Sequence, residues 1–145
     1  MIKAVIQEER TGCGIASAAA IAGIRYKEAR ADANALGIYA EDQRLWSETA
    51  HVRRLLAHYG FKTMSTETPF RSWEALPDLA LLAIKWYKVK GRPFWHWVVF
   101  VRENGCACVL DSKRELQSQI RTDFGRMKPK WFLEANRSQH RIDRK

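Results

Sequence analysis

The stretch Gln7-Glu-Glu-Arg-Thr-Gly-Cys13-Gly-Ile-Ala-Ser-Ala-Ala-Ala-Ile-Ala22 is the part of the sequence that most strongly predicts the fold. A polar loop ends at Thr11-Gly12, and residues 13–24 are then small and apolar, with five alanines among them. Because alanine has the highest helix propensity, we predict a helix over residues 13–24. This helix is apolar on nearly every side, so we expect it to be buried and closely approached by neighbouring strands.

Cys13 stands at the start of this helix. The N-terminus of a helix carries a partial positive charge and unpaired N–H groups, and both stabilise a thiolate, which is the nucleophilic form of cysteine. Gly12 and Gly14 flank Cys13, so the backbone here can approach a substrate closely. A small buried hydrophobe is an equally good reading of this cysteine taken alone. Cys13 is therefore a candidate nucleophile that needs support from elsewhere in the chain.

The strongest strand signal lies much later in the chain, at residues 95–101. These residues, Trp-His-Trp-Val-Val-Phe-Val, are dense in aromatic and β-branched side chains. Asn104-Gly105 is the signature of a two-residue hairpin turn, so residues 106–110 are predicted to be the returning strand. In that register Glu103 faces Cys106, and this first pair determines all the remaining facing pairs of the two strands.

The hairpin register brings His96 and Asp111 together. Val98 faces Asp111 in this register, and because strand side chains alternate, Asp111 shares a face with His96 as its diagonal neighbour. Asp111 can then bond one ring nitrogen of His96 and leave the other for Cys13. A nucleophile, a base and an orienting carboxylate in a row are the parts of a catalytic triad. A lone histidine in a strand is otherwise usually structural.

Gln7 is the fourth candidate. It lies six residues before Cys13, and its amide could pair with the Cys13 backbone N–H to bind an oxyanion. A glutamine in such a loop is usually polar surface, so only the company of Cys13, His96 and Asp111 makes it a candidate.

These residues also resemble a known family. The run from Gln7 to Cys13-Gly-Ile-Ala resembles the Gln-x5-Cys-Gly-x-Ala opening of the double-glycine leader peptidases found at the N-terminus of bacteriocin exporters. The run His96-Trp-Val-Val-Phe-Val, followed by Val109-Leu-Asp111-Ser, looks like that family's histidine strand and its aspartate. The resemblance covers about residues 2–112.

The resemblance implies a papain-like cysteine peptidase that needs no cofactor or metal. Residue by residue, it implies that Gln7 binds the oxyanion and that Cys13 is the nucleophile. It implies further that His96 is the base and that Asp111 orients it. It also implies cleavage of a peptide, or of an isopeptide-like bond, after small residues such as Gly-Gly. Two departures concern that substrate most: Gly12 stands where the family usually has Asp, and Ser112 stands where Pro is common.

The rest of the chain predicts an α+β fold in which N-terminal helices pack on an antiparallel sheet, because helical patterns precede strand patterns. We predict helices over residues 26–36 and 47–59, strands over 61–65 and 79–87, a loop over 88–93, a helical turn over 115–121, and a last strand or packed hook over 131–133.

The totals favour one domain over residues 1–145, with a basic flexible tail at 136–145, and the resemblance implies that this domain is papain-like. No apolar run approaches the ~20 residues of a membrane span, and no signal peptide is seen, so we expect a cytoplasmic location. Three cysteines, an odd number, argue against a disulfide framework, and Cys106 and Cys108 are expected in a buried strand. Packing is the preferred reading of these two thiols over metal binding with His51 or His58.

Two other functions remain open at this point. One is a catalytically silent papain-like domain that binds a peptide or a partner protein, although the presence of all four candidate residues favours an enzyme. The other is a basic nucleic-acid-binding protein, because 25 Lys and Arg stand against 16 Asp and Glu for a net charge of +9. We expect nucleic acid to be an unlikely partner, and the basic segment at residues 85–92 to steer an acidic peptide.

Overall fold

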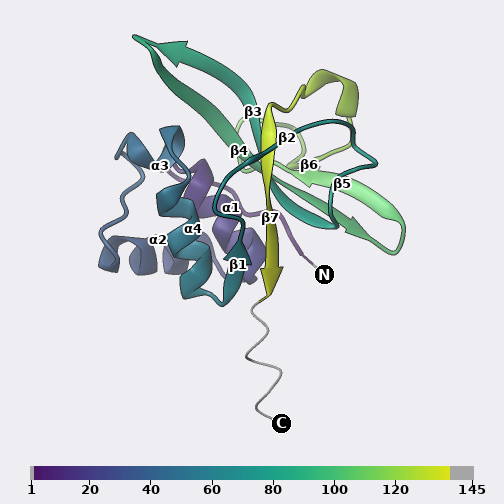
Figure 1. The fold of residues 1–145 in the computed structure, drawn as a ribbon. Helices are drawn as coiled ribbons and strands as arrows, with labels where there is room; N and C mark the ends of the chain where they lie inside the picture. The colour runs from purple at the N-terminus through teal and green to yellow at the C-terminus, as the bar shows by residue number, and fades with distance from the viewer. Residues whose placement is uncertain (1, 138–145) are drawn as a thin grey trace.

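The computed structural model of the protein describes residues 2–137, in which four helices pack beside a seven-stranded sheet (Figure 1). The helices are α1 (Cys13–Ala22), α2 (Tyr26–Ala35), α3 (Arg44–Ser47) and α4 (Ala50–His58). The strands are β1 (Phe61–Thr63), β2 (Thr68–Pro69), β3 (Leu79–Val89), β4 (Arg92–Glu103), β5 (Cys106–Leu110), β6 (Ile120–Arg121) and β7 (Trp131–Arg137). All strand pairings are antiparallel, so the predicted α+β class, with N-terminal helices on an antiparallel sheet, is confirmed.

The buried first helix is also confirmed. Helix α1 begins at Cys13, and nine of its ten residues are buried. It ends at Gly23, whose left-handed φ of 77° lets its N–H bond back to the carbonyl of Ala19. Because half of its residues are alanine, α1 lies close against its neighbours on several sides.

The predicted helix over residues 47–59 is too long at its start. Glu48 is extended, with φ −143° and ψ 163°, and it separates α4 from the short helix α3. Just before α3, the Asp42 carboxylate accepts a hydrogen bond from the backbone N–H of Arg44 at 3.0 Å, a local contact that the helical periodicity does not reveal.

The last described strand, β7, lies inside the sheet. The strand order is β1-β7-β3-β4-β5-β6, and β2 also pairs with β7. The chain therefore returns at its C-terminal end to fill the place between β1 and β3 (Figure 1). The prediction of a last strand or hook at residues 131–133 is confirmed as a strand.

The predicted loop over residues 88–93 is wrong. Strand β3 continues to Val89 and β4 begins at Arg92, so only Lys90 and Gly91 form the turn. Both have positive φ, 50° and 81°, as a two-residue hairpin turn with matched twist requires. The sequence pattern missed this turn because lysine is an unusual residue at such a position. The resulting hairpin projects beyond the rest of the sheet (Figure 1).

Two predictions near the C-terminus also need correction. Residues 115–121 do not form a helical turn, because the chain ends this segment in β6, which pairs with β5. Asn136 and Arg137 do not belong to the predicted tail over residues 136–145, because they are the last residues of β7 and pair with β1. The rest of the predicted tail, residues 138–145, lies outside the described residues.

Both faces of the sheet are covered, which explains the continuous apolar run in β4. Trp97 and Val99 point into a core that the helices complete, whereas Val98 and Phe100 point into a second, smaller core. The loop residues Trp73 and Phe124 pack against this second core. Among residues 2–137 we find no helix with the length and apolar content that a membrane crossing requires.

Candidate active site

The N-terminus of α1 meets an open edge of β4. Strand β5 pairs with β4 only as far as Val99 and Leu110 and then leaves it. Beyond that point the Trp97 N–H donates to Cys13 Sγ at 3.3 Å, and the Trp97 carbonyl accepts from Ser17 Oγ at 3.5 Å. The first turns of α1 thus occupy the place that a longer β5 would fill. This arrangement sets the Cys13 sulfur against the strand that carries His96.

Close contacts surround the glycines beside Cys13, and at Gly12 they leave no room for a side chain. A Cβ on Gly12 would collide with the Tyr26 hydroxyl and lie 3.2 Å from the Glu9 carbonyl oxygen. A Cβ on Gly14 would lie 3.2 Å from Leu45 Cδ1. The Tyr26 hydroxyl therefore accounts for the glycine at position 12, where the resembled family usually has a larger residue.

A cluster that sequence reasoning missed supports the loop before Cys13. The Glu9 carboxylate accepts hydrogen bonds from the Tyr26 hydroxyl and, at 2.7 Å, from Arg30. Burial would raise the pKa of Glu9, but these two bonds outweigh it and the pKa is lowered. The charged carboxylate ties the loop to α2, which carries both partners.

His96 and Asp111 are in direct contact. His96 Nε2 lies 2.7 Å from Asp111 Oδ1, and the Asp111 side chain is 1% exposed. The hairpin register that predicted this contact is confirmed, because Glu103 pairs with Cys106 in β4 and β5. Cys13 and His96 line the same hollow, and interaction with the Cys13 side chain helps to raise the pKa of His96. Since Asp111 engages Nε2, Nδ1 is the ring nitrogen left for Cys13.

The charges of this pair are strongly coupled. Burial opposes the charged form of His96, but hydrogen bonds and charge interactions with Asp111 and Cys13 raise its pKa to about 9. Burial likewise opposes the charged form of Asp111, yet the bond and charge of His96 lower its pKa to about 2. At neutral pH the ring is therefore an imidazolium beside a carboxylate.

Arg121 is a further partner of Asp111 that the sequence did not predict. Its guanidinium donates to Asp111 Oδ2 at 2.9 Å and forms a fork to Asp123 at 2.7 and 2.9 Å. The backbone N–H of Lys113 donates to Asp111 Oδ1 at 3.1 Å. No sequence signal marked Arg121, because the two-residue strand β6 that carries it is too short to have a recognisable pattern.

Gln7 lies at the start of the loop that leads to Cys13, and both its amide nitrogen and its amide oxygen are hydrogen-bonded. Its Nε2 donates to the carbonyls of Glu9 and Arg10 at 2.9 and 2.8 Å. Its Oε1 accepts from Ser112 Oγ at 2.6 Å, and its backbone N–H donates to the Ser112 carbonyl. Ser112 thus has a definite partner, and Gln7 connects the loop before Cys13 to the residue after Asp111.

Two hollows open beside His96, and both are also lined by Lys85 and Arg10. One contains Cys13 and is walled by the aromatic rings of Trp46, Tyr87 and Trp95. The other lies on the side of Gln7 and is lined mainly by charged residues. Trp95 thus lies beside the cysteine, whereas Trp97 is fully buried in the core under the helices.

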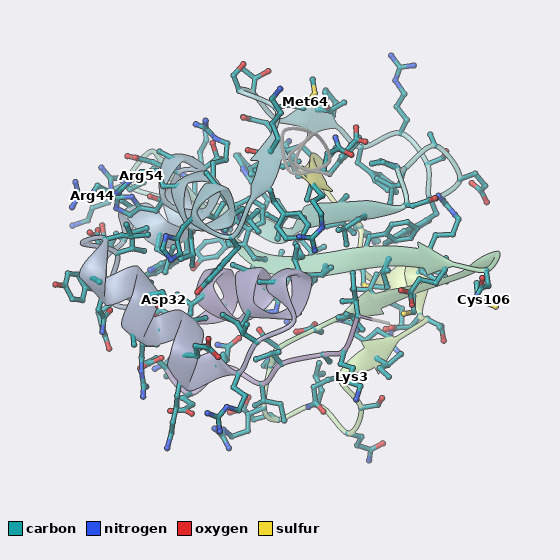
Figure 2. The ribbon with its side chains drawn as sticks, turned by 90° about the horizontal axis from the view of Figure 1, so that it is seen from below. Lys3, Asp32, Arg44, Arg54, Met64 and Cys106 are labelled. Carbon is teal, nitrogen blue, oxygen red and sulfur yellow. The ribbon has the colours of Figure 1, made fainter. Side chains whose placement is uncertain are left out.

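The other two cysteines are not buried as predicted. Cys106 is exposed and Cys108 is half-buried, because they lie next to the β4–β5 turn rather than in the middle of the sheet. Figure 2 shows Cys106 at the opposite side of the molecule from Asp32, Arg44 and Arg54 on the helices. Burial, followed by the charge of Glu103, raises the pKa of Cys108.

Comparison with known proteins supports the fold. Two solved structures are similar over nearly the whole chain, each with 16% sequence identity. One is a double glycine motif protease from an AMS/PCAT transporter in complex with the leader peptide, with a TM-score of 0.62, covering 95% of this chain and 93% of that one. The other is the peptidase domain of Streptococcus ComA, a bi-functional ABC transporter of a quorum-sensing pathway, with a TM-score of 0.55, covering 95% and 100%. The papain-like fold and the resemblance to leader peptidase domains are therefore shown.

No protein-family model and no curated protein sequence matches this chain. At 16% identity, the likeness to the two structures concerns the fold.

Proposed function

We propose that the protein is a cysteine peptidase that cleaves a peptide or isopeptide-like bond, with Cys13 as nucleophile, His96 as base and Asp111 as orienter. The observation that carries the proposal is the contact of His96 with Asp111 in a hollow that Cys13 also lines, at the N-terminus of a buried helix. Burying a carboxylate, here 1% exposed, costs free energy unless charged partners compensate it, and His96 and Arg121 are the partners of Asp111.

The proposed reaction needs only groups present in the chain. The Cys13 thiolate attacks the carbonyl carbon, and as the C–N bond breaks, the imidazolium of His96 gives its proton to the leaving amine. The thioester formed on Sγ is then attacked by water, whose proton passes to His96. The acid product leaves, and the thiolate–imidazolium pair is restored. The Trp97 N–H on Sγ and the helix N-terminus favour the thiolate throughout.

The proposed oxyanion site consists of the Cys13 backbone N–H and the Gln7 amide. The first N–H groups of a helix have no partner within the helix, so the Cys13 N–H is suited to this role. Gln7 would have to release one of its two bonds, to the carbonyl of Glu9 or of Arg10, when substrate arrives. Its position between the cysteine loop and Ser112 supports this role.

The proposed substrate is a peptide with small residues before the scissile bond. Cys13 is only 4% exposed, and the rings of Trp46 and Trp95 wall its hollow, so a bulky residue would not reach the sulfur. The similar protease structure bears the name of a double glycine motif. A Gly-Gly junction is therefore the first sequence to test.

Thiol reactivity tests the nucleophile independently of substrate. We expect iodoacetamide at about pH 6 to modify Cys13 before Cys106, even though Cys106 is exposed, because the Trp97 N–H, the N-terminus of α1 and the imidazolium of His96 all favour a thiolate at Cys13. Peptide mapping by mass spectrometry identifies the site. Faster modification of Cys106 at this pH would contradict the thiolate–imidazolium pair.

Hydrolysis of a peptide with a Gly-Gly junction tests the activity itself. We expect Cys13→Ala to abolish cleavage, and the matched change Cys106→Ala to leave it intact, since that thiol lies at the far end of the β4–β5 hairpin. If the folded, reduced protein binds such peptides without cutting them, the silent peptide-binding domain replaces the peptidase.

A further inference from the structure

A bulge in β3 places a lysine in the lining of the two hollows beside His96. The pairing of β3 with β4 shifts register between Ile84, which pairs with His96, and Tyr87, which pairs with Phe94, so β3 contains one extra residue there. Lys85, in this bulge, has a φ of 55°, a left-handed conformation that is uncommon for residues other than glycine. Bulges often occur next to active sites, where they redirect a side chain. Here the redirected side chain lines both hollows beside His96.

The hollow on the side of Gln7, which we name the basic hollow, contains an excess of positive charge. Its cationic lining residues are Arg10, Lys85, Lys113 and Arg114. None of the ion pairs within residues 2–137 involves any of these four.

The acidic side chains of the basic hollow offset only part of this charge. Glu8 and Glu9 share one arginine, Arg30, at 3.1 and 2.7 Å, and Glu115 is the third acidic residue. Burial and the charge of Lys113 lower the pKa of Lys85, as expected where like charges crowd together. An incoming anion would relieve this repulsion.

The place of the basic hollow relative to the sulfur indicates which part of a substrate would enter it. The acyl half of the substrate becomes attached to Cys13, whose hollow is the aromatic one. The leaving amine must be close to His96, which protonates it. The basic hollow contains His96 but not Cys13, so it lies on the side of the leaving fragment.

We propose that the basic hollow is a subsite for a carboxylate on the leaving fragment, and that Lys85 is the residue that binds it. This inference rests on the proposed peptidase function. The carboxylate belongs either to an acidic side chain near the cut or to the free C-terminus of a short leaving fragment. Both present the same chemistry to Lys85, and they are separated by experiment.

The test uses peptides with the same acyl half ending in Gly-Gly. The leaving fragment begins with Asp or Asn and is amidated, or it is a short alanine fragment with a free or an amidated C-terminus. In each pair we compare the peptide that has the carboxylate with its neutral counterpart. For the pair whose carboxylate enters the basic hollow, we expect the wild-type kcat/KM to be about three- to fivefold higher with the carboxylate, the effect of an exposed ion pair. Lys85→Met should remove most of this preference, and Lys113→Met should reduce it.

Lys88→Met is the matched control, because it removes the same charge from an exposed residue of the β3–β4 hairpin outside the basic hollow. We expect it to retain the preference. Equal losses in Lys85→Met and Lys88→Met would indicate general charge steering and overturn the subsite, as would a wild-type enzyme with no preference.

Binding separates the subsite from the activity. Free leaving fragments with and without the carboxylate are titrated into the Cys13→Ala protein, which performs no chemistry, and the His96 ring signals are followed by NMR. Binding that requires both the carboxylate and Lys85 supports the subsite even if no peptide is cut. Cleavage without such binding would overturn the subsite and leave the peptidase standing.

Discussion

At the scale of single residues, one buried carboxylate serves two cations. Asp111 accepts from His96 on one oxygen and from Arg121 on the other, and the backbone N–H of Lys113 completes its set of donors. Arg121 also lies in a fork with Asp123. Arg121 is therefore a positioning residue: it holds Asp111 in place, while its positive charge limits how strongly Asp111 can stabilise the imidazolium.

This arrangement predicts pKa shifts of opposite sign in two variants. Asp111→Asn removes the negative charge and should bring the pKa of His96 well below about 9. Arg121→Met removes a positive charge from the far side of Asp111 and should raise that pKa further. An NMR titration of the His96 ring measures both, without any assumed activity. For hydrolysis, we expect Asp111→Asn to cost about 10³–10⁴-fold in kcat, as in other triads.

Asp123→Asn is the control, because it leaves the bond between Arg121 and Asp111 in place. A His96 pKa that moves in the same direction in Asp111→Asn and Arg121→Met would contradict this account of the charges.

Stability should also depend on pH through this pair. The pKa of Asp111 is about 2 in the folded protein against an ordinary 3.8, so its contribution is present above pH 3.8 and is lost as pH falls toward 2. The pKa of His96 is raised from 6.5 to about 9, so its contribution is present below pH 6.5 and is lost as pH rises through 9. Urea unfolding at several pH values should show both losses in the wild type and smaller losses in a variant lacking the pair, in which other carboxylates of lowered pKa, such as Glu9, still contribute at low pH.

At the scale of elements, the start of α1 is positioned by its contact with α2. Gly12 has no room for a side chain because the Tyr26 hydroxyl, held by Glu9, occupies that space. Strand β4 supplies the other boundary, since its Trp97 N–H bonds the Cys13 sulfur. The cysteine is thus located by two elements far from it in sequence.

We predict that Gly12→Ala destabilises the protein by about 1–3 kcal/mol, the usual effect of overpacking. Tyr26→Phe removes the hydroxyl that the new methyl group would meet, so the same substitution should cost less in that background. Denaturant unfolding of the two single variants and the double variant measures this coupling. The Tyr26→Phe substitution should not remove the whole cost, because the new Cβ would still lie 3.2 Å from the Glu9 carbonyl oxygen.

Gly125→Ala is the matched control, because a Cβ at that position would meet nothing within 4 Å. An equal penalty for Gly12→Ala with and without the Tyr26 hydroxyl would show that the contact is not the cause.

At the scale of the whole molecule, β7 joins the two parts of the sheet. It pairs with β3 on one side and with β1 and β2 on the other, so β1 and β2 are joined to the rest of the sheet only when β7 is in place. Leu133 of β7 is fully buried in the core that the helices share.

We therefore predict that Leu133→Ala lowers the free energy of unfolding by about 2–5 kcal/mol, as for other buried leucines. The control Ile120→Ala, at a residue that is 58% exposed, should change it by less than about 0.5 kcal/mol. Urea unfolding followed by circular dichroism decides between them. Similar small effects at both positions would mean that β7 is not an integral part of the core.

The parts that could be predicted are those that short segments encode. The helix at Cys13 follows from a run of alanines, and the contact of His96 with Asp111 follows from the Asn104-Gly105 turn and the alternation of strand side chains. The β3–β4 turn at Lys90 and the strand β6 were missed, because their sequences have weak local preferences and pairing with neighbours decides their structure.

The sequence by itself determined the class of fold, the helix that begins at Cys13 and the hairpin register that brings the side chains of His96 and Asp111 together. Each of these depends on residues close together in the chain. Only the tertiary structure decided that Arg121 supports Asp111, that the Gln7 amide is engaged by its own loop, and that a bulge places Lys85 in the lining of the hollows beside His96. These features depend on segments far apart in sequence that pack together only in the folded chain. There, the space and the charged groups of one segment determine which side-chain contacts the other can make.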